Sequence, residues 1–333
     1  AGLRPLTENL DVPDNAYADG ASTLKTIELL NEFDRDNKNF FLTVGFQKPH
    51  LPFTPPKKYW DLYQRDDIKL AEFQSKSIGS PQEAYHRSGE LRNYHDTEPS
   101  MDENGIVSEA KQRELIHGYM ASVSFIDAQV GMILDHLEST GMDENTVIVF
   151  FGDHGWHLGD HGLWNKHSNF EEATRTPLIF RSPDIDGGFV NDSPVELLDI
   201  FPTVCTLAGI PKPDDLDGIS LVPILEKKSE YLRDFAISQY PRRCNVMRSV
   251  IGRYPDDCTL MGYAVRNEKY RYVAWISGDF EDRSDFNNDE IVMEELYDYE
   301  IDPLETKSYA SDASYQKVKE GMIKDLRSVI WEK

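Results

Sequence analysis

The segment FFGDHGWHLGDHGLWNKHSNF, residues 150–170, gathers four His, two Asp, one Lys and two Trp in a short stretch. It continues directly from NTVIVF (145–150), an apolar run with the length and composition of a buried strand. A solvated loop has no need of two Trp, and a core segment does not tolerate Asp and His without partners. The crowded segment at a strand end is therefore the first candidate for a functional site, in a fold of the α/β class.

The pattern on either side of this segment supports the α/β class. Strands apolar on both faces alternate with amphipathic helices, which predicts a central, mostly parallel sheet sandwiched by helices. We expect strands at 39–46, 145–151 and 176–180, and helices at 21–36, 109–140, 169–174 and 195–210. The helix over 109–140 has about nine turns and should end at Gly141.

The residue pattern changes near residue 236, from alternating strands and helices to short segments rich in β-forming residues. The segments AISQY, LMGYAVRN and YRYVAWIS are rich in β-forming residues and separated by short connections, and a helix is expected at about 312–331. We therefore predict an α/β domain over residues 1–235 and a C-terminal subdomain over 236–333, made of a small antiparallel sheet plus a helix. Residues 63–108 are polar and irregular and are expected to form a surface excursion.

Composition excludes some classes of protein. A chain of 333 residues can bury a large core, and its net charge of −24 argues against nucleic acid as a partner, because phosphate binding needs a basic surface. No apolar run approaches the ~20 residues of a membrane span. The first residues, AGLRPLTENLDVPDN, have no apolar region typical of a signal peptide and look like the middle of a protein.

The chain has three cysteines and no Cys-x-x-Cys motif, so a zinc or redox motif built on cysteine is not expected. Cys205 lies in an apolar helical stretch and is interpreted as a core thiol. Cys244 and Cys258 bracket a short polar segment, and whether they pair stays open.

Two predicted strands end in groups that can carry chemistry. One ends in Lys48-Pro49-His50 and the other in Asp153-His154 between glycines. A carboxylate oxygen and an imidazole nitrogen are ligands for a divalent cation, and Lys166 can add a fixed positive charge. A metal and cations around an anion are what phosphoryl or sulfuryl transfer requires. Taken singly, each signal also has a structural explanation: a capping Asp-His pair, a surface lysine, a rigid proline loop or core tryptophans.

A resemblance decides between these interpretations. The stretch FGDHGWHLGDHGLWNKHSNFEEATRTPLIF (151–180) resembles the sulfatase branch of the alkaline phosphatase superfamily, and within it the iduronate-2-sulfatase group. The resemblance extends to FFLTVGFQKPHLPF (40–53), YMASVSFIDAQVGMILDHL (119–137), VELLDIFPTVCTLAGIP (195–211) and ELYDYEIDPLETKS (295–308). It covers nearly the whole chain except the weaker segment 63–108.

The resemblance implies roles for particular residues. Asp153 and His154 correspond to calcium ligands, and Lys166 and His50 to catalytic groups that hold the sulfate. His50 is placed to protonate the leaving alcohol. Lys48 and Trp156 are expected to bind substrate. The implied substrate is a sulfated sugar or glycosaminoglycan, and the implied compartment is lysosomal or secreted, or periplasmic or secreted in a bacterium.

The chain also departs from the family pattern. The family's nucleophile is a formylglycine made from the Cys of a Cys-x-Pro-Ser-Arg motif, and no such motif occurs here. The family's Asp-Asp calcium ligands after its first strand have no counterpart either, because Asp66-Asp67, Asp214-Asp215 and Asp256-Asp257 follow no apolar strand. We therefore expect an N-terminally truncated chain, inactive alone, whose missing portion lies upstream or in a separate chain.

Two other functions stay open. A phosphodiesterase or phosphonate hydrolase of the same superfamily would reuse the Asp-His strand end. A non-catalytic, sulfatase-like binding protein would keep these groups without the nucleophile. In either enzyme the acidic groups are expected to lie away from the crevice, at 279–290 and 102–104, with Arg175 and Arg242 near it.

Overall fold

The computed structural model describes residues 4–96, 106–243, 259–277 and 291–330. The chain divides into two compact units, Ala1–Glu72 with Ser88–Thr146, and Phe73–Arg87 with Val147–Lys333. Each unit has its own core and is described by itself. The domain boundary expected near residue 235 stays a prediction, and Ala236 begins a strand inside the second unit.

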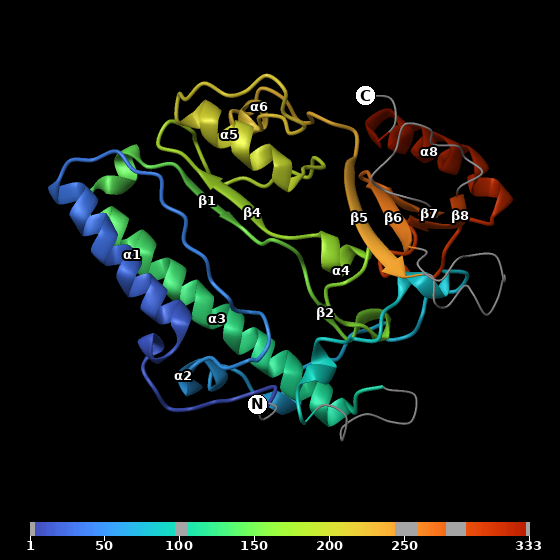
Figure 1. Ribbon diagram of the computed structural model, residues 1–333, viewed down its shortest axis with the longest axis horizontal. Helices are drawn as coiled ribbons and strands as arrows, with labels where there is room; N and C mark the ends of the chain where they lie inside the picture. Colours follow the sequence, from blue (N-terminus) through green and yellow to red (C-terminus); the bar gives the residue numbers. More distant parts are fainter. Residues whose placement is uncertain (1–3, 97–105, 244–258, 278–290, 331–333) are drawn as a thin grey trace. The chain divides into compact units, whose positions relative to one another are not determined.

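Helices build the first unit (Figure 1). They are α1 (Ala18–Arg35), α2 (Lys57–Trp60) and α3 (Glu109–Thr140), joined by 3-10 turns η1 (Asp14–Ala16), η2 (Arg65–Asp67), η4 (Leu91–Asn93) and η6 (Met142–Asn145). The predicted helices at 21–36 and 109–140 are confirmed. The Ser108 hydroxyl accepts from the Lys111 amide at the start of α3, and Gly141 ends the helix at a φ of 73°.

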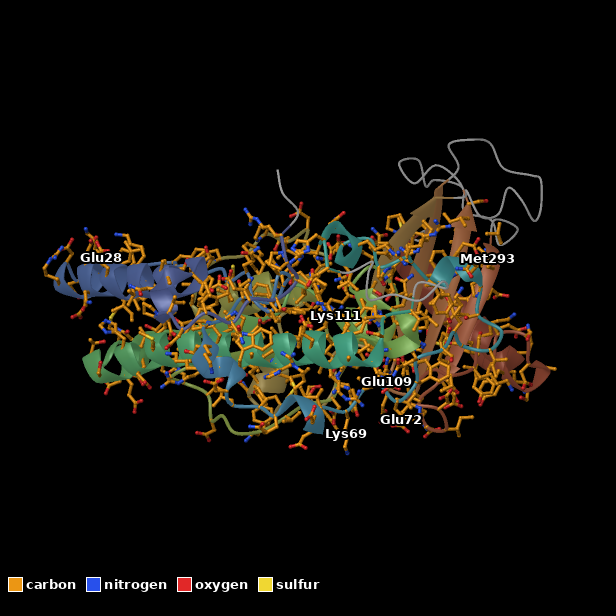
Figure 2. The ribbon with its side chains drawn as sticks, turned by 90° about the horizontal axis from the view of Figure 1, so that it is seen from below. Glu28, Lys69, Glu72, Glu109, Lys111 and Met293 are labelled. Carbon is orange, nitrogen blue, oxygen red and sulfur yellow. The ribbon has the colours of Figure 1, made fainter. Side chains whose placement is uncertain are left out.

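The core of this unit forms where α3 meets α2 and the segment before it. Phe53 and Trp60 are almost fully buried beside α3. Gly118 permits this contact, since a Cβ there would lie 2.7 Å from the Phe53 Cβ and 2.8 Å from the Trp60 ring. Lys111, near the start of α3 (Figure 2), is buried with ion pairs to Asp96 and Glu114 at 2.8 and 2.9 Å.

The predicted buried strand at 39–46 is wrong for the residues that the structure describes. This segment belongs to no ladder, and its side chains alternate between half-buried and exposed, with Phe41 84% exposed. Composition makes such a run suited to a strand, but a strand becomes buried only when neighbouring strands pair with it. The segment 63–108 holds only short turns and isolated bridges within its described part. The expected surface excursion is wrong for Ala84, Tyr85 and Leu91, whose side chains are buried.

The second unit contains all the strands assigned in the described residues. They are β1 (Ile148–Phe151), β2 (His157–Leu158), β3 (Trp164–Asn165), β4 (Leu178–Arg181), β5 (Ala236–Arg243), β6 (Thr259–Arg266), β7 (Tyr270–Ser277) and β8 (Ile291–Asp298). Its helices are α4 (Glu171–Thr174), α5 (Ile200–Leu207), α6 (Val222–Leu225) and α8 (Gln316–Ile330), with the 3-10 turns η3 (Gln82–Ala84), η7 (Asp160–Gly162), η8 (Leu197–Asp199) and η10 (Ala313–Tyr315).

The mixed α/β class is confirmed, together with the C-terminal antiparallel sheet and helix. Of the expected central sheet, the described residues form one pair, β1 with β4, and this pair runs antiparallel. The parallel pairings found among them are the isolated bridges of Thr7 with Phe53 and of Ile78 with Lys307. A parallel ladder needs further strands beside β1 and β4, and the described segments supply none.

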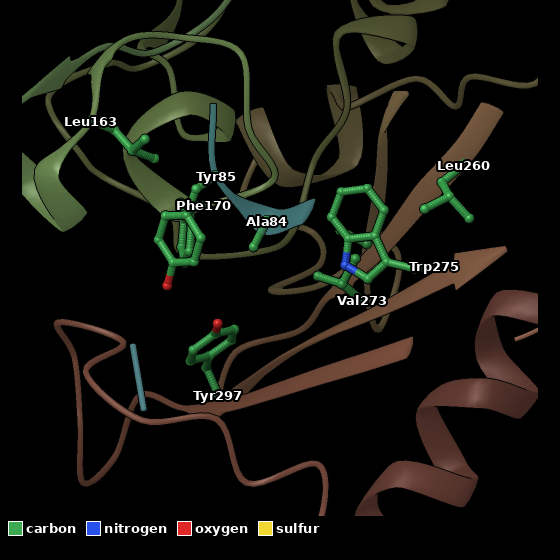
Figure 3. Packing of buried hydrophobic residues seen from close by; sticks show 9 residues of the cluster. Ala84, Tyr85, Leu163, Phe170, Leu260, Val273, Trp275 and Tyr297 are labelled. Carbon is green, nitrogen blue, oxygen red and sulfur yellow. The ribbon is translucent and has the colours of Figure 1, made fainter. Parts of the chain in front are cut away.

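The C-terminal sheet has the order β5-β6-β7-β8, and all its neighbours are antiparallel. Met322 and Leu326 of α8 pack with Tyr263, Tyr272 and Leu296 in one hydrophobic cluster. Figure 3 shows a second cluster, in which Trp275 and Tyr297 of the sheet pack with side chains from the crowded segment and the η3 turn. These are Leu163 and Phe170 of the segment and Ala84 and Tyr85 at the η3 turn, and the sheet adds Leu260, Ala264 and Val273.

The expected core thiol is confirmed, because Cys205 on α5 is only 7% exposed. Cys244 and Cys258 lie outside the described residues, as do the acidic stretches 279–290 and 102–104. Of the helices searched, none combines the length and the apolar content that crossing a membrane would demand.

Candidate functional site

A small hairpin brings Trp156 and Lys166 together. Strands β2 and β3 pair antiparallel, with His157 opposite Asn165 and Leu158 opposite Trp164. Continuing this register by one step places Trp156 opposite Lys166, at the open end of the hairpin. The Lys166 Nζ lies 5.2 Å from the centre of the Trp156 ring, which is a cation–π distance. The crowded segment is thus folded back on itself so that its lysine returns to its beginning.

Asp153 and His154 lie at the same end of the hairpin segment. The Asp153 Oδ2 is 3.6 Å from the His154 Nε2, and the Asp153 side chain is 84% exposed. The His154 ring stacks beside Trp156, with centroids 6.1 Å apart. Within this unit, Asp153, His154, Trp156 and Lys166 therefore form one connected group, whose carboxylate is open to solvent.

Close packing explains why glycines, Gly152 and Gly155, flank the Asp153-His154 pair. A Cβ on Gly155 would lie 2.0 Å from the Glu172 carbonyl oxygen, and the Gly155 amide donates to the Ala173 carbonyl at 2.9 Å. A Cβ on Gly152 would lie 2.2 Å from the Thr176 hydroxyl. The backbone can therefore pass against α4 and the segment after it only without side chains at these two positions.

The pair fits part of a metal site. The His154 Nδ1 lies 2.8 Å from the Gly155 carbonyl oxygen, which can only accept, so Nδ1 carries a proton and Nε2 is the atom that faces Asp153. Metal-binding histidines commonly donate their other N–H in this way. Two ligand atoms of one ion are about 3–4 Å apart at the bond lengths of calcium, which agrees with 3.6 Å. Calcium takes six to eight ligands, so these two residues supply part of a shell.

Lys48 and His50 belong to the first unit, on a loop with cis peptide bonds before Pro49 and Pro52. Asp19 holds this loop by accepting from the Lys48 amide, and the Lys48 ammonium donates to the His50 carbonyl at 3.3 Å. Burial lowers the pKa of the Lys48 side chain, with Asp19 opposing the shift. The His50 Nδ1 lies 2.8 Å from the Leu51 carbonyl oxygen. The prediction that these groups meet those of the second unit stays a prediction.

Arg242 has a structural contact that the sequence does not reveal. Its guanidinium donates to the Glu83 carbonyl at 2.9 Å and to the His167 carbonyl, next to Lys166. It therefore anchors the residue after Lys166 to the η3 turn. Arg175 is exposed on the described surface.

Residues with buried ionisable groups were missed at the sequence level. His161, Glu172 and Glu305 place one ligand atom each within 4.8 Å of one another. Glu172 and Glu305 lie far apart in the chain and belong to no short motif, so no sequence signal links them. Of the three histidines of the crowded segment without an assigned role, His157 and His161 are fully or almost fully buried, and His167 is half-buried.

The chain matches two known protein families over most of its length. The chain matches the family described as "Sulfatase" over residues 3–210 and the family described as "N-sulphoglucosamine sulphohydrolase, C-terminal" over residues 159–332. The chain belongs to the sulfatase family. It is 32% identical to the iduronate 2-sulfatase of Mus musculus, and the match covers 92% of this chain and 64% of the relative. The chain thus spans somewhat less than two thirds of that protein.

Solved structures agree on the fold. A protein in complex with its substrate D-glucosamine-2-N,6-O-disulfate superimposes with a TM-score of 0.70 at 20% identity, covering 94% of this chain and 70% of its own. The phosphonate monoester hydrolase of Agrobacterium radiobacter superimposes with a TM-score of 0.71 at 23% identity, covering 99% and 64%. The resemblance to the sulfatase family stated from the sequence is confirmed by the family match and by the iduronate 2-sulfatase relative.

Proposed function

We propose that the complete protein is a sulfuric ester hydrolase of the iduronate-2-sulfatase type that acts on sulfated sugars. The observation that carries this proposal is the connected group of Asp153, His154, Trp156 and Lys166 in a member of the sulfatase family. Such a group combines metal ligands, a cation and a flat apolar face, which suits a sulfate ester on a sugar ring. The similarity to an iduronate 2-sulfatase supports the finer assignment to glycosaminoglycan substrates.

We assign a role to each residue. Asp153 and His154 would supply part of the ligand shell of a calcium ion, and the bound ion would provide positive charge, as a Lewis acid, at the sulfate oxygens. Lys166 neutralises charge that develops on the sulfate, and the Trp156 ring beneath it orients the ammonium and contacts the sugar. His50 donates a proton to the leaving alcohol, and Lys48 contributes to binding the anion. Lys166 and Lys48 are assigned these roles because a transition state that gains negative charge is stabilised by fixed positive groups.

The proposed nucleophile is a formylglycine located outside these 333 residues, which contain no Cys-x-Pro-Ser-Arg sequence. A lysosomal or secreted location, periplasmic in a bacterium, goes with such an enzyme in this proposal. The 59 acidic residues are consistent with an acidic compartment such as the lysosome. At low pH some of them would be protonated, which would weaken their repulsion of a sulfated substrate.

A phosphonate monoester hydrolase is the second candidate, because proteins of that description share the fold. The test is to express the full-length protein and compare kcat/KM for an aryl sulfate, a phosphonate monoester and a phosphodiester. We expect the sulfate ester to be the preferred substrate by a large factor. A preference for the phosphonate would overturn the proposal, and binding of a sulfated disaccharide without turnover of any ester would identify a binding protein instead.

A further inference from the structure

A second group of ionisable side chains lies in the same unit, in addition to the Asp153 and His154 pair. It consists of His157, His161, Glu172 and Glu305, which we call the His-Glu cluster. The side chains of His157, His161 and Glu305 are at most 1% exposed, and that of Glu172 is 27% exposed. Three of them lie between residues 157 and 172, in β2, η7 and α4, and the fold adds Glu305 from the segment after β8.

The ligand atoms of the cluster face one another across distances that no hydrogen bond spans. The His161 Nε2 lies 3.8 Å from the Glu172 Oε2 and 3.9 Å from the Glu305 Oε2. The His157 Nδ1 lies 3.9 Å from the same Glu172 oxygen. Hydrogen bonds between such atoms would measure about 2.7–3.2 Å. Both the His157 Nδ1 and the Glu172 Oε2 are buried without a hydrogen-bond partner.

The outer nitrogens of both rings have hydroxyl partners. The His157 Nε2 lies 2.7 Å from the Ser168 Oγ, and the His161 Nδ1 lies 3.4 Å from the Ser77 Oγ. Protons on these outer nitrogens leave the inner lone pairs facing carboxylate oxygens. Burial lowers the pKa of both rings, that of His161 to about 3 with Arg271 adding to the shift. Lone pairs facing anionic oxygens repel unless a proton or a cation lies between them.

The two carboxylates of the cluster have only one cationic side chain, Arg271, paired with them in the described residues. Arg271 donates to the Glu305 Oε1 at 2.5 Å, and the Tyr299 hydroxyl donates to the same oxygen at 2.5 Å. These contacts orient Glu305, whose Oε2 faces His161 and also accepts from the Glu171 amide at 3.4 Å. Glu172 has no Lys or Arg partner among the residues that the structure describes. Its pKa is raised to about 7, first by burial and then by Glu305.

We propose that the His-Glu cluster binds one zinc ion through His157 Nδ1, His161 Nε2, Glu172 Oε2 and Glu305 Oε2. Two imidazoles and two carboxylates suit zinc better than calcium, which prefers oxygen ligands throughout. Tetrahedral zinc with bonds of about 2.0–2.2 Å brings ligand atoms to about 3.4 Å, so the three His–Glu distances of 3.8–3.9 Å would contract by roughly half an ångström. The ligand atoms of His161, Glu172 and Glu305 already lie within 4.8 Å of one another, and His157, which is outside this group, would have to move further. The serine, arginine and tyrosine contacts are the outer partners that such ligands need.

The ion would have a structural role and would be distinct from the calcium proposed at Asp153 and His154. His157 follows Trp156 directly and pairs with Asn165, which precedes Lys166. Fixing His157 therefore fixes the hairpin whose open end carries Trp156 and Lys166.

The experiment uses the chelator-treated chain and ZnCl2 alone as the probe. Bound zinc is measured after gel filtration, with the Tm recorded before and after addition. We expect one zinc per chain and a higher Tm. Cobalt in place of zinc should give the intense visible absorption of a tetrahedral site, which a merely adventitious surface ion would not give. Retention of no zinc, or no change in the Tm, would overturn the proposal.

Variants locate the ion. Glu172→Gln and His157→Gln should each weaken zinc binding by at least about tenfold, whereas Asp153→Asn should leave it unchanged. Metal-free Glu172→Gln should fold as well as the metal-free wild type, because Gln has the shape of a protonated carboxyl group. Zinc lost in Asp153→Asn but kept in Glu172→Gln would place the ion at the other pair and refute this site. Because the readouts are zinc content and Tm, a failure of the sulfatase assay would leave the result intact.

Discussion

At the residue scale, the decisive contact is the one between Lys166 and Trp156. A lysine on a surface is ordinarily mobile, but this one follows a two-residue strand and lies over an aromatic ring. Ordering of the ammonium before substrate arrives reduces the cost of orienting it in the transition state. The contact with Trp156 is the feature that distinguishes Lys166 from a mobile surface lysine, and a substitution of Lys166 tests its role directly.

In the full-length enzyme, Lys166→Ala should lower kcat/KM for an aryl sulfate by about 10²–10³-fold, the usual effect of removing one preorganised charge-stabilising group. Lys307→Ala is the matched control, because Lys307 is exposed and lies 4.7 Å from the Tyr309 ring in a similar cation–π contact. Steady-state kinetics of both variants check the prediction. Near-normal activity of Lys166→Ala would show that the lysine is an ordinary surface residue.

At the element scale, α3 shows how one helix uses glycine in two ways. Gly118 faces Phe53 and Trp60 at distances that exclude a side chain, whereas nothing lies within 4 Å of a Cβ built on Gly131. Gly131→Ala should therefore stabilise the protein by about 0.5–1 kcal/mol, since alanine loses less backbone entropy in a helix. Gly118→Ala should instead destabilise it by about 1–3 kcal/mol through overpacking.

Denaturant unfolding of the two alanine variants, followed by circular dichroism, gives both free energies of unfolding. Each variant is the other's control, because the substitution and the helix are the same. Equal shifts in both variants would contradict the packing of α3 described above.

At the scale of the whole molecule, the net charge of −24 must be reconciled with an anionic substrate. Charges are screened beyond about 8 Å at physiological ionic strength, so a local group of metal and lysine can outweigh distant carboxylates. A long polyanion would extend past this local group and meet the acidic surface. The complete enzyme should therefore prefer short or terminal substrates to long polymers, most strongly at low salt.

Measuring kcat/KM for sulfated oligosaccharides of increasing length at two salt concentrations tests this prediction. The value should fall with length at low salt, and the fall should become smaller at high salt. A preference for the longest chains at low salt would mean that the surface charge is distributed in another way.

The sequence by itself determined what depends on local spacing. The apolar steps of three and four predicted α3, and Gly141 marked its end because capping is a local interaction. The change of pattern near residue 236 predicted the antiparallel sheet and α8. The Asp153, His154 and Lys166 candidates were identified because they lie within one short motif, and the structure places them together in one unit.

Only the tertiary structure decided which residues meet across long distances in the chain. The apolar run 39–46 is suited to a strand, but its burial depends on neighbours that composition does not specify. The His-Glu cluster gathers Glu172 and Glu305 from separate elements, and no periodicity relates them. Their contact arises from the packing of α4 and the segment after β8 around buried Arg271, because a charged group in the interior must find its partners wherever the fold brings them.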